Sequence, residues 1–196
     1  MKRFVRGPEP AILSQKGPAW AADWERKRAA NPSKPFRWPA VNKIPLNQHL
    51  LPQLKEQTQD HCSFCDQYPV SPPSKDTIEH FRPKSRFPAE AYAWANLYYC
   101  CDYCQRKGER YDEGLLRPDA NDYEFQRYFR WDYTLGRIEV NERATPADQE
   151  RARVTIELYG LNEGEHPSLR RRESRRRHRE PDEPLDDFAY RHYLEP

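Results

Sequence analysis

The sequence predicts an α+β protein, and three observations carry that prediction. Short β-prone segments at residues 77–81 and 96–100 lie on either side of a loop that contains Pro83 and Pro88. Helical patterns precede and follow these segments. Two Cys-x-x-Cys pairs, at residues 62–65 and 101–104, enclose both of them. We therefore expect a small strand pair between two cysteine pairs, with helices on either side.

The chain of 196 residues corresponds to one domain with attached arms. We expect an N-terminal arm with one short helix at 1–46, a core at 47–120, and a C-terminal part at 121–196 with a hairpin, helices, an arginine-rich segment and an acidic tail. Charged residues make up 33% of the chain and hydrophobic residues 36%, so the core needs reinforcement. No apolar run has signal-peptide or membrane-spanning character, which predicts a cytoplasmic protein without a membrane partner.

The N-terminal arm is rich in proline, which predicts extended backbone. We expect one helix at Trp20–Ala29, anchored on the main body by Trp20 and Trp24, which are four residues apart. Asn47 is expected to cap a second helix that leads to Cys62. Phe36 and Trp38, in the arm, are predicted either to dock a partner or to wrap the core.

Farther along, residues 125–133 and 137–140 are expected to pair as a hairpin. Thr145 is expected to cap a helix that Gly160 ends. Pro167 then begins an arginine-rich helix. Its arginines could contact a polyanion or form a solvated face paired with Glu173 and Glu180, and the sequence favours neither. These arginines are Arg170, Arg171, Arg172, Arg175, Arg176, Arg177 and Arg179.

The two Cys-x-x-Cys pairs have the composition of a structural zinc site. Each pair can turn both sulfurs toward one ion, and together they complete a closed tetrahedral set. In a reducing compartment four such thiols favour metal over disulfides. Cys100 is out of register and is expected to be a small buried filler. The predicted ligands are Cys62, Cys65, Cys101 and Cys104.

Between the cysteine pairs lie three further polar motifs: Thr77-Ile78-Glu79-His80-Phe81-Arg82-Pro83-Lys84-Ser85, then Trp94-Ala95-Asn96-Leu97, then Gln105-Arg106-Lys107 after the second pair. With these residues the chain resembles the HNH family of ββα-metal nucleases. It is most similar to the PtuB-like HNH nuclease subunits of Septu and retron anti-phage defence systems. The similarity extends to the Met1-Lys2-Arg3-Phe4 start and to Tyr159-Gly160-Leu161-Asn162.

The resemblance implies a ββα-metal, treble-clef-like core and endonucleolytic cleavage that leaves 5′-phosphate and 3′-hydroxyl ends. It also implies a role in phage defence and an ATPase partner of the SMC or ABC type. Asn96 would fix the loop and orient the imidazole of His80.

Phosphodiester hydrolysis needs a base for water and a cation for the phosphate. His80 suits the first task, and the carboxylate of Glu79 is a hard ligand for Mg²⁺ or Mn²⁺.

The third motif departs from the family pattern. Relatives carry Asn or His directly after the second cysteine pair, where this chain has Gln105, and the usual Lys arrives one residue early as Lys107. Gln105 can ligate the catalytic ion through its amide oxygen. Glu109 or Asp112, expected farther along the same helix, could replace it.

Four cations near the motif are candidate phosphate ligands: Arg82, Lys84, Arg86 and Lys107. The expected substrate is nucleic acid, with DNA favoured and RNA as the alternative, since no base-reading element is recognisable. Two rival interpretations stay open. The chain could be a non-catalytic nucleic-acid-binding zinc module, or an assembly subunit whose nuclease site has decayed, as Gln105 suggests.

Overall fold

The computed structural model describes residues 1–70 and 77–195. It is a mixed α+β fold with three antiparallel two-stranded sheets. The helices are α1 (Ala11–Ala30), α2 (Leu46–Thr58), α3 (Asp102–Gln105), α4 (Phe125–Tyr128), α5 (Pro146–Leu158), α6 (His166–Arg179) and α7 (Arg191–Leu194). The strands are β1 (Ala40–Val41), β2 (Ile44–Pro45), β3 (Thr77–His80), β4 (Leu97–Cys100), β5 (Phe129–Asp132) and β6 (Arg137–Val140). The α+β class predicted from the sequence is confirmed.

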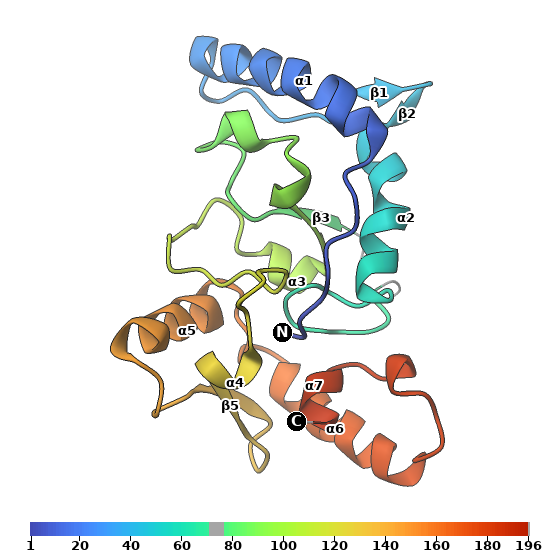
Figure 1. Cartoon of the computed structure of the whole chain (residues 1–196), viewed down its shortest axis with the longest axis vertical. Coiled ribbons are helices and arrows are strands. Elements are labelled where there is room, and N and C mark those ends of the chain that lie inside the picture. The colour runs from blue at the N-terminus through green and yellow to red at the C-terminus, as the bar shows by residue number, and fades with distance from the viewer. Residues whose placement is uncertain (71–76, 196) are drawn as a thin grey trace.

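The central sheet pairs β3 with β4, and α3 follows β4 directly (Figure 1). Its register places Glu79 opposite Tyr98 and His80 opposite Leu97. Helix α1 and the β1–β2 hairpin lie at one end of the molecule, and α4, α5, α6 and α7 at the other (Figure 1). The candidate motif residues of β3 and β4 therefore lie in the middle of the fold.

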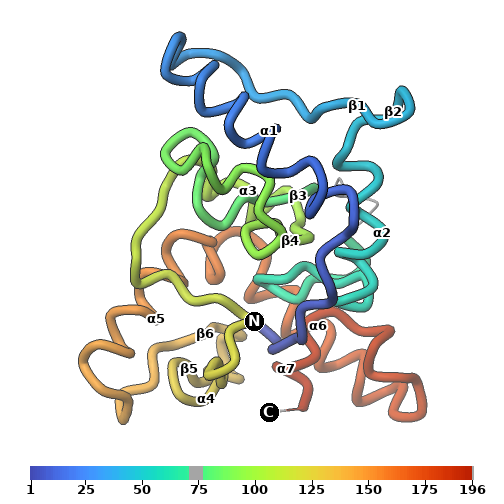
Figure 2. Tube along the Cα trace, turned by 45° about the horizontal axis from the view of Figure 1, so that its top comes forward, coloured from blue at the N-terminus to red at the C-terminus, as the bar shows by residue number. Residues whose placement is uncertain are grey.

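The N-terminal residues run through the fold rather than away from it. The first ten residues pass the central sheet, and residue 1 lies near α7 in both views (Figure 2). The Arg6 guanidinium donates to the carbonyls of Trp94 and Leu97 at 2.8 and 3.0 Å and pairs with Asp119 at 2.7 Å. These contacts fix the segment just before β4.

One hydrophobic cluster, rich in aromatic side chains, includes residues from all three expected segments, from Met1 to Leu161. Phe64, which lies between two of the paired cysteines, stacks on Tyr159 with ring centroids 3.9 Å apart. Tyr98 of β4 also packs on Phe64, at 5.2 Å. Aromatic stacking thus joins the first cysteine pair, the central sheet and the end of α5.

Two helix starts differ from the sequence prediction. Helix α1 begins at Ala11, nine residues before the expected start, and contains Pro18. Buried Leu13 and Gly17 pack this early part on the core, which offsets the backbone hydrogen bond that Pro18 cannot make. Asn47 does not cap α2: the helix starts at Leu46 after Pro45, with no side-chain cap.

The C-terminal elements agree with the sequence prediction, except that residues 125–128, expected to be part of the hairpin, form a helix. Residues 129–132 pair with 137–140 as the predicted hairpin, while 125–128 form the short helix α4. The Thr145 hydroxyl accepts from the backbone N–H of Asp148 at 3.2 Å, as an N-cap should. Gly160, with φ of +59°, follows the end of α5. In the described residues, no helix combines the length and apolar character that crossing a bilayer requires.

Candidate functional site

The four paired cysteines converge on one buried point. The sulfurs of Cys62, Cys65, Cys101 and Cys104 all lie within 4.8 Å of one another, and all four residues are buried. The Sγ atoms of Cys65 and Cys101 are 3.6 Å apart. Tetrahedral zinc with Zn–S bonds of about 2.3 Å requires sulfurs roughly 3.8 Å apart. The cysteines are free thiols, so this group could hold a zinc ion.

Local backbone contacts shape each cysteine pair. The Cys101 sulfur accepts from the backbone N–H of Cys104 at 3.4 Å and caps the short helix α3. The backbone N–H of Ser63 donates to the carbonyl of Tyr99 at 3.0 Å, which ties the first pair to β4. Cys100 is buried, and its thiol donates to the Cys101 carbonyl at 3.1 Å. It stays outside the four-sulfur group, consistent with a filler role.

A buried ion pair ties the C-terminal segment to the first cysteine pair. Asp66 follows Cys65 directly, and its Oδ1 lies 2.7 Å from Nη2 of Arg191. The backbone N–H of Arg191 donates to Oδ2 of Asp66 at 2.7 Å. The backbone N–H of Tyr190 donates to the Asp66 carbonyl, also at 2.7 Å. Both side chains of the ion pair are at most 5% exposed. Their mutual attraction and their hydrogen bonds therefore offset the cost of removing both charges from water.

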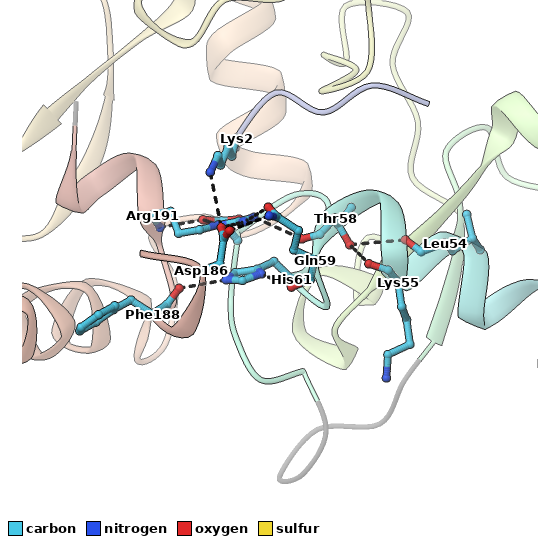
Figure 3. Close-up of polar contacts among 10 residues, drawn as sticks. Lys2, Leu54, Lys55, Thr58, Gln59, His61, Asp186, Phe188 and Arg191 are labelled. Atoms are coloured by element: carbon cyan, nitrogen blue, oxygen red, sulfur yellow. Dashed lines mark hydrogen bonds and ion pairs between the residues drawn. The ribbon is translucent and has the colours of Figure 1, made fainter. Parts of the chain in front are cut away.

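Arg191 also reaches the turn after α2 (Figure 3). Its guanidinium donates to Oδ1 of Asp186 at 2.7 Å and to the Thr58 carbonyl at 3.3 Å. His61 lies beside it, with Nε2 2.9 Å from the carbonyl of Phe188. These contacts join residues 58–66 to residues 186–191. Sequence reasoning missed Asp66 and Arg191 as a pair, because 125 residues separate them and neither belongs to a local motif.

His80, at the end of β3, is 5% exposed. Its ring stacks on Trp38 with centroids 5.4 Å apart and contacts Phe36 edge-on, also at 5.4 Å. Burial, together with the charge of Lys84, lowers the pKa of His80 to about 3. Phe36 and Trp38 therefore wrap the core over the imidazole, rather than standing free as a docking surface.

The His80 ring has a defined tautomer. Nε2 lies 3.0 Å from the carbonyl of Ala91. Because a carbonyl only accepts, Nε2 carries the hydrogen and Nδ1 keeps the lone pair. In the described part of the chain Nδ1 has no hydrogen-bond partner, and it is not among the fully buried unpartnered nitrogens. Nδ1 is thus the ring nitrogen with a free lone pair.

Asn96 holds the loop between the strands. Its Oδ1 accepts from the backbone N–H of Arg82 at 2.7 Å. Its Nδ2 donates to the carbonyls of Arg82 and Glu90, both at 3.0 Å. Glu90 directly precedes Ala91, whose carbonyl positions the His80 ring. Asn96 therefore links the two ends of the loop, next to the carbonyl that orients the imidazole.

Glu79 is engaged by a lysine. Its Oε1 lies 2.8 Å from Nζ of Lys107, whose side chain has no exposed surface. Lys107 also donates to the carbonyls of Phe81 and Arg110 at 3.3 and 3.2 Å. Burial raises the pKa of Glu79 to about 7, and the charge of Lys107 opposes that rise. Lys107, predicted as a phosphate ligand, instead neutralises Glu79 inside the protein.

The side chains predicted to bind a catalytic ion, Glu79 and Gln105, are already engaged by other groups. The Gln105 amide donates to the carbonyl of Ile78 at 3.4 Å, and Glu79 already holds the Lys107 ammonium. Helix α3 ends at Gln105, so Glu109 and Asp112 lie beyond the helix on which they were expected. In the described residues, the only group of three or more closely spaced Cys, His, Asp or Glu side chains is the four-cysteine group.

In the part of the chain that the structure describes, one of the other three predicted phosphate ligands is engaged by carboxylates and two are not. Arg82 pairs with Glu90 at 2.8 Å and with Glu113 at 3.0 Å. Lys84 lies over the Phe36 ring, with Nζ 5.2 Å from its centroid. Arg86 is exposed and donates to the Tyr111 carbonyl at 3.3 Å. Lys84 and Arg86 therefore pair with no carboxylate in the described residues, and the charge of Lys84 acts on His80.

Comparison of the sequence with protein-family models gives no match, and comparison with curated proteins gives none either.

Cys101→Ser should abolish stoichiometric zinc binding and lower the free energy of unfolding, because three thiolates leave the closed tetrahedral set incomplete. Cys100→Ser is the matched control: it alters the neighbouring thiol and should keep one zinc per chain. Zinc content by inductively coupled plasma mass spectrometry and the midpoint of urea unfolding check both. Equal zinc loss in the two variants would contradict the assignment of ligands.

Arg191→Met should destabilise the zinc-loaded protein by about 3–5 kcal/mol, because it leaves the Asp66 carboxylate buried without its partner. Arg153→Met is the control, since the exposed Arg153–Glu150 pair is worth only about 0–1 kcal/mol. Urea denaturation measures both changes. A cost for Arg191→Met no larger than that of the control would show that the C-terminal segment does not secure the first cysteine pair.

Proposed function

We propose that this protein is a nuclease of the HNH type, with a structural zinc ion in its four-cysteine group. Nucleic acid is the substrate, with DNA favoured over RNA. The observation that carries the proposal is the hydrogen bond from His80 Nε2 to the Ala91 carbonyl, at 3.0 Å. It leaves the Nδ1 lone pair free to accept a proton from water once the aromatic rings over His80 move away, which is the task of a general base.

The surroundings of His80 support the same role. β3, β4 and α3 follow the strand–strand–helix order of the nucleases that the sequence resembles. Asn96 makes hydrogen bonds to Arg82 and Glu90 of the intervening loop and so fixes that loop, as the resemblance implies for the middle residue of the motif. Lys84, which lies over the Phe36 ring that contacts His80, can meet a phosphate there.

The aromatic cover implies that the protein must open before it acts. With its pKa near 3, His80 is a weak base while Phe36 and Trp38 desolvate it. Displacing residues 36–38 would expose the ring and return its pKa toward the ordinary value of about 6.5. An SMC- or ABC-type ATPase partner, which the resemblance implies, could supply that displacement in an anti-phage complex.

A catalytic Mg²⁺ or Mn²⁺ would help neutralise charge on the phosphate. Glu79 and Gln105 do not fit such an ion as they lie, because Glu79 holds Lys107 and Gln105 bonds to Ile78. We therefore assign no catalytic step to a metal at this position.

The second candidate function is a non-catalytic zinc-dependent module that binds nucleic acid or assembles a complex. Two observations favour it: His80 is covered, and the Glu79–Lys107 pair is internal. In that case the pair would only stabilise the centre of the fold. Substitution of His80 separates the two candidates.

His80→Ala should lower the rate of DNA cleavage at least about a hundredfold, because general bases contribute roughly 10²–10⁴ to rate. The assay uses Mn²⁺ or Mg²⁺ with a supercoiled plasmid, and zinc content should not change. His49→Ala, at an exposed histidine on α2, is the control. Cleavage by His80→Ala at the control's rate would exclude the catalytic role.

Replacing both Phe36 and Trp38 with Ala should raise the cleavage rate of the isolated chain roughly five- to hundredfold. Two aromatic contacts of about 0.5–1.5 kcal/mol each oppose opening of the cover. Trp20→Ala is the control, because Trp20 packs on Tyr92 without contacting His80. Carbethoxylation of His80, followed by peptide mass spectrometry, should rise in parallel. Unchanged reactivity of His80 in the double variant would contradict the account of the cover.

A further inference from the structure

The arginines of helix α6 lie on two faces, one turned toward the protein and one toward solvent. Successive helical residues are about 100° apart, so Arg172 and a group of four other basic residues fall within roughly 120° on the outward side. The four are Arg171, Arg175, His178 and Arg179, and all five side chains are exposed. No acidic residue of α6 lies on that face.

The inner arginines have structural partners. Arg170 is 1% exposed and donates to the carbonyls of Leu161 and Gly136 at 2.6 and 3.1 Å. Arg176 pairs with Glu180 at 2.8 Å. Arg177 donates to the Glu183 carbonyl at 2.7 Å. These three residues hold α6 against the hairpin and the C-terminal segment, so they are not available to a ligand.

Of the outer arginines, Arg172 lies 3.8 Å from Glu173, and the other three lack such a partner among the residues that the structure describes. Within residues 1–70 and 77–195, no carboxylate lies within ion-pair distance of Arg171, Arg175 or Arg179. These three residues are four positions apart in sequence and form a stripe with a spacing of about 6 Å along the helix axis. Like charges at this spacing repel and destabilise a helix by about 0.2–0.5 kcal/mol per pair. A polyanion would relieve that repulsion.

The start of α6, the helix that carries this stripe, is fixed by tight packing. An added Cβ at Gly136, in the β5–β6 turn, would lie 2.3 Å from the Pro167 carbonyl and 3.0 Å from Cγ of Arg171. The turn therefore packs tightly against the start of α6 and the stem of Arg171. Since the helix backbone is fixed before any ligand arrives, only the arginine side chains have to be ordered when the stripe binds.

We propose that the arginine stripe, defined as Arg171, Arg175 and Arg179, binds the phosphate backbone of nucleic acid at a surface separate from Glu79 and His80. The inference deepens the proposed function, because it supplies a second contact with the same class of substrate. Helix α6 lies toward one end of the molecule and β3 in its middle (Figure 1). A duplex that touches both must extend along the protein, which orients it without reading its sequence.

The chemistry of the stripe favours nucleic acid over two other anions. A helix that lies on a membrane needs an apolar face turned toward lipid, whereas the other face of α6 is packed against the protein. An acidic protein partner would require an apolar anchor beside the charges. The half-exposed Tyr133 and Leu135, in the neighbouring hairpin turn, could serve as one. Three arginines at a regular sequence spacing, none of them in an ion pair within the described residues, match a repeating phosphate chain better.

The test measures binding without cleavage. His80→Ala protein, loaded with zinc, is titrated into fluorescein-labelled 30-base-pair DNA, and anisotropy is followed from 50 to 300 mM KCl. The test variant adds Arg171→Gln, Arg175→Gln and Arg179→Gln. The control variant adds Arg26→Gln, Arg143→Gln and Arg153→Gln, which remove the same charge from exposed positions elsewhere.

In the test variant the slope of log Kd against log salt concentration should fall by about 2.7, since each lost phosphate contact contributes about 0.9. At 150 mM salt this corresponds to roughly a hundredfold weaker binding. The control variant should bind within about threefold of the parent. Helicity by circular dichroism should be unchanged or higher in the test variant, because the repulsion is gone.

Equal affinities of the test and control variants would overturn the proposal. It would also fail if poly-L-glutamate competed with DNA at equal charge concentration, or if phosphatidylserine vesicles bound the stripe more tightly than DNA does. The proposed nuclease activity is judged separately, because every binding measurement uses protein without His80. Loss of DNA binding in the test variant supports the stripe whether or not the parent chain cleaves.

Discussion

Convergence of four cysteine sulfurs on one buried point is the constraint on which the rest of the structure depends. Strands β3 and β4 have four residues each, too few for a stable isolated hairpin. The sulfur group joins the turn after α2 to the start of α3, and both strands lie between these points in sequence. A zinc ion held there would contribute its binding free energy directly to folding. A chain with few apolar residues gains from such a crosslink.

The centre of the fold is reinforced from two sides. Asp66, which follows the first cysteine pair, forms an ion pair with Arg191. The position of the C-terminal segment therefore depends on the position of the first cysteine pair. The Glu79–Lys107 pair lies between β3 and the residues after α3. On the other side of β3, the imidazole of His80 is held by the Ala91 carbonyl and covered by two aromatic rings. The same rigidity that orients the imidazole also hides it, so a catalytic role depends on movement of residues 36–38.

Local patterns in the sequence were enough to predict the α+β class, the four cysteines, the hairpin and the Thr145 cap, because each depends on neighbouring residues. Asn96 was singled out by its place in a motif, and its contacts lie within the adjacent loop. The early start of α1 was missed because Leu13 and Gly17 gain tertiary packing that outweighs Pro18. The burial of Lys107 and the Arg191–Asp66 pair come from contacts between distant segments, which residue spacing does not reveal.

Hydrogen–deuterium exchange with and without zinc tests the central constraint most directly. If the metal site holds the strand pair, chelation should remove protection from the amides of residues 77–80 and 97–100. Helix α5 packs on α4 and β6, so its amides should lose much less protection. Unchanged protection of both strands in the fully zinc-free protein would contradict the account, since the strand pair would then stand without the sulfur crosslink.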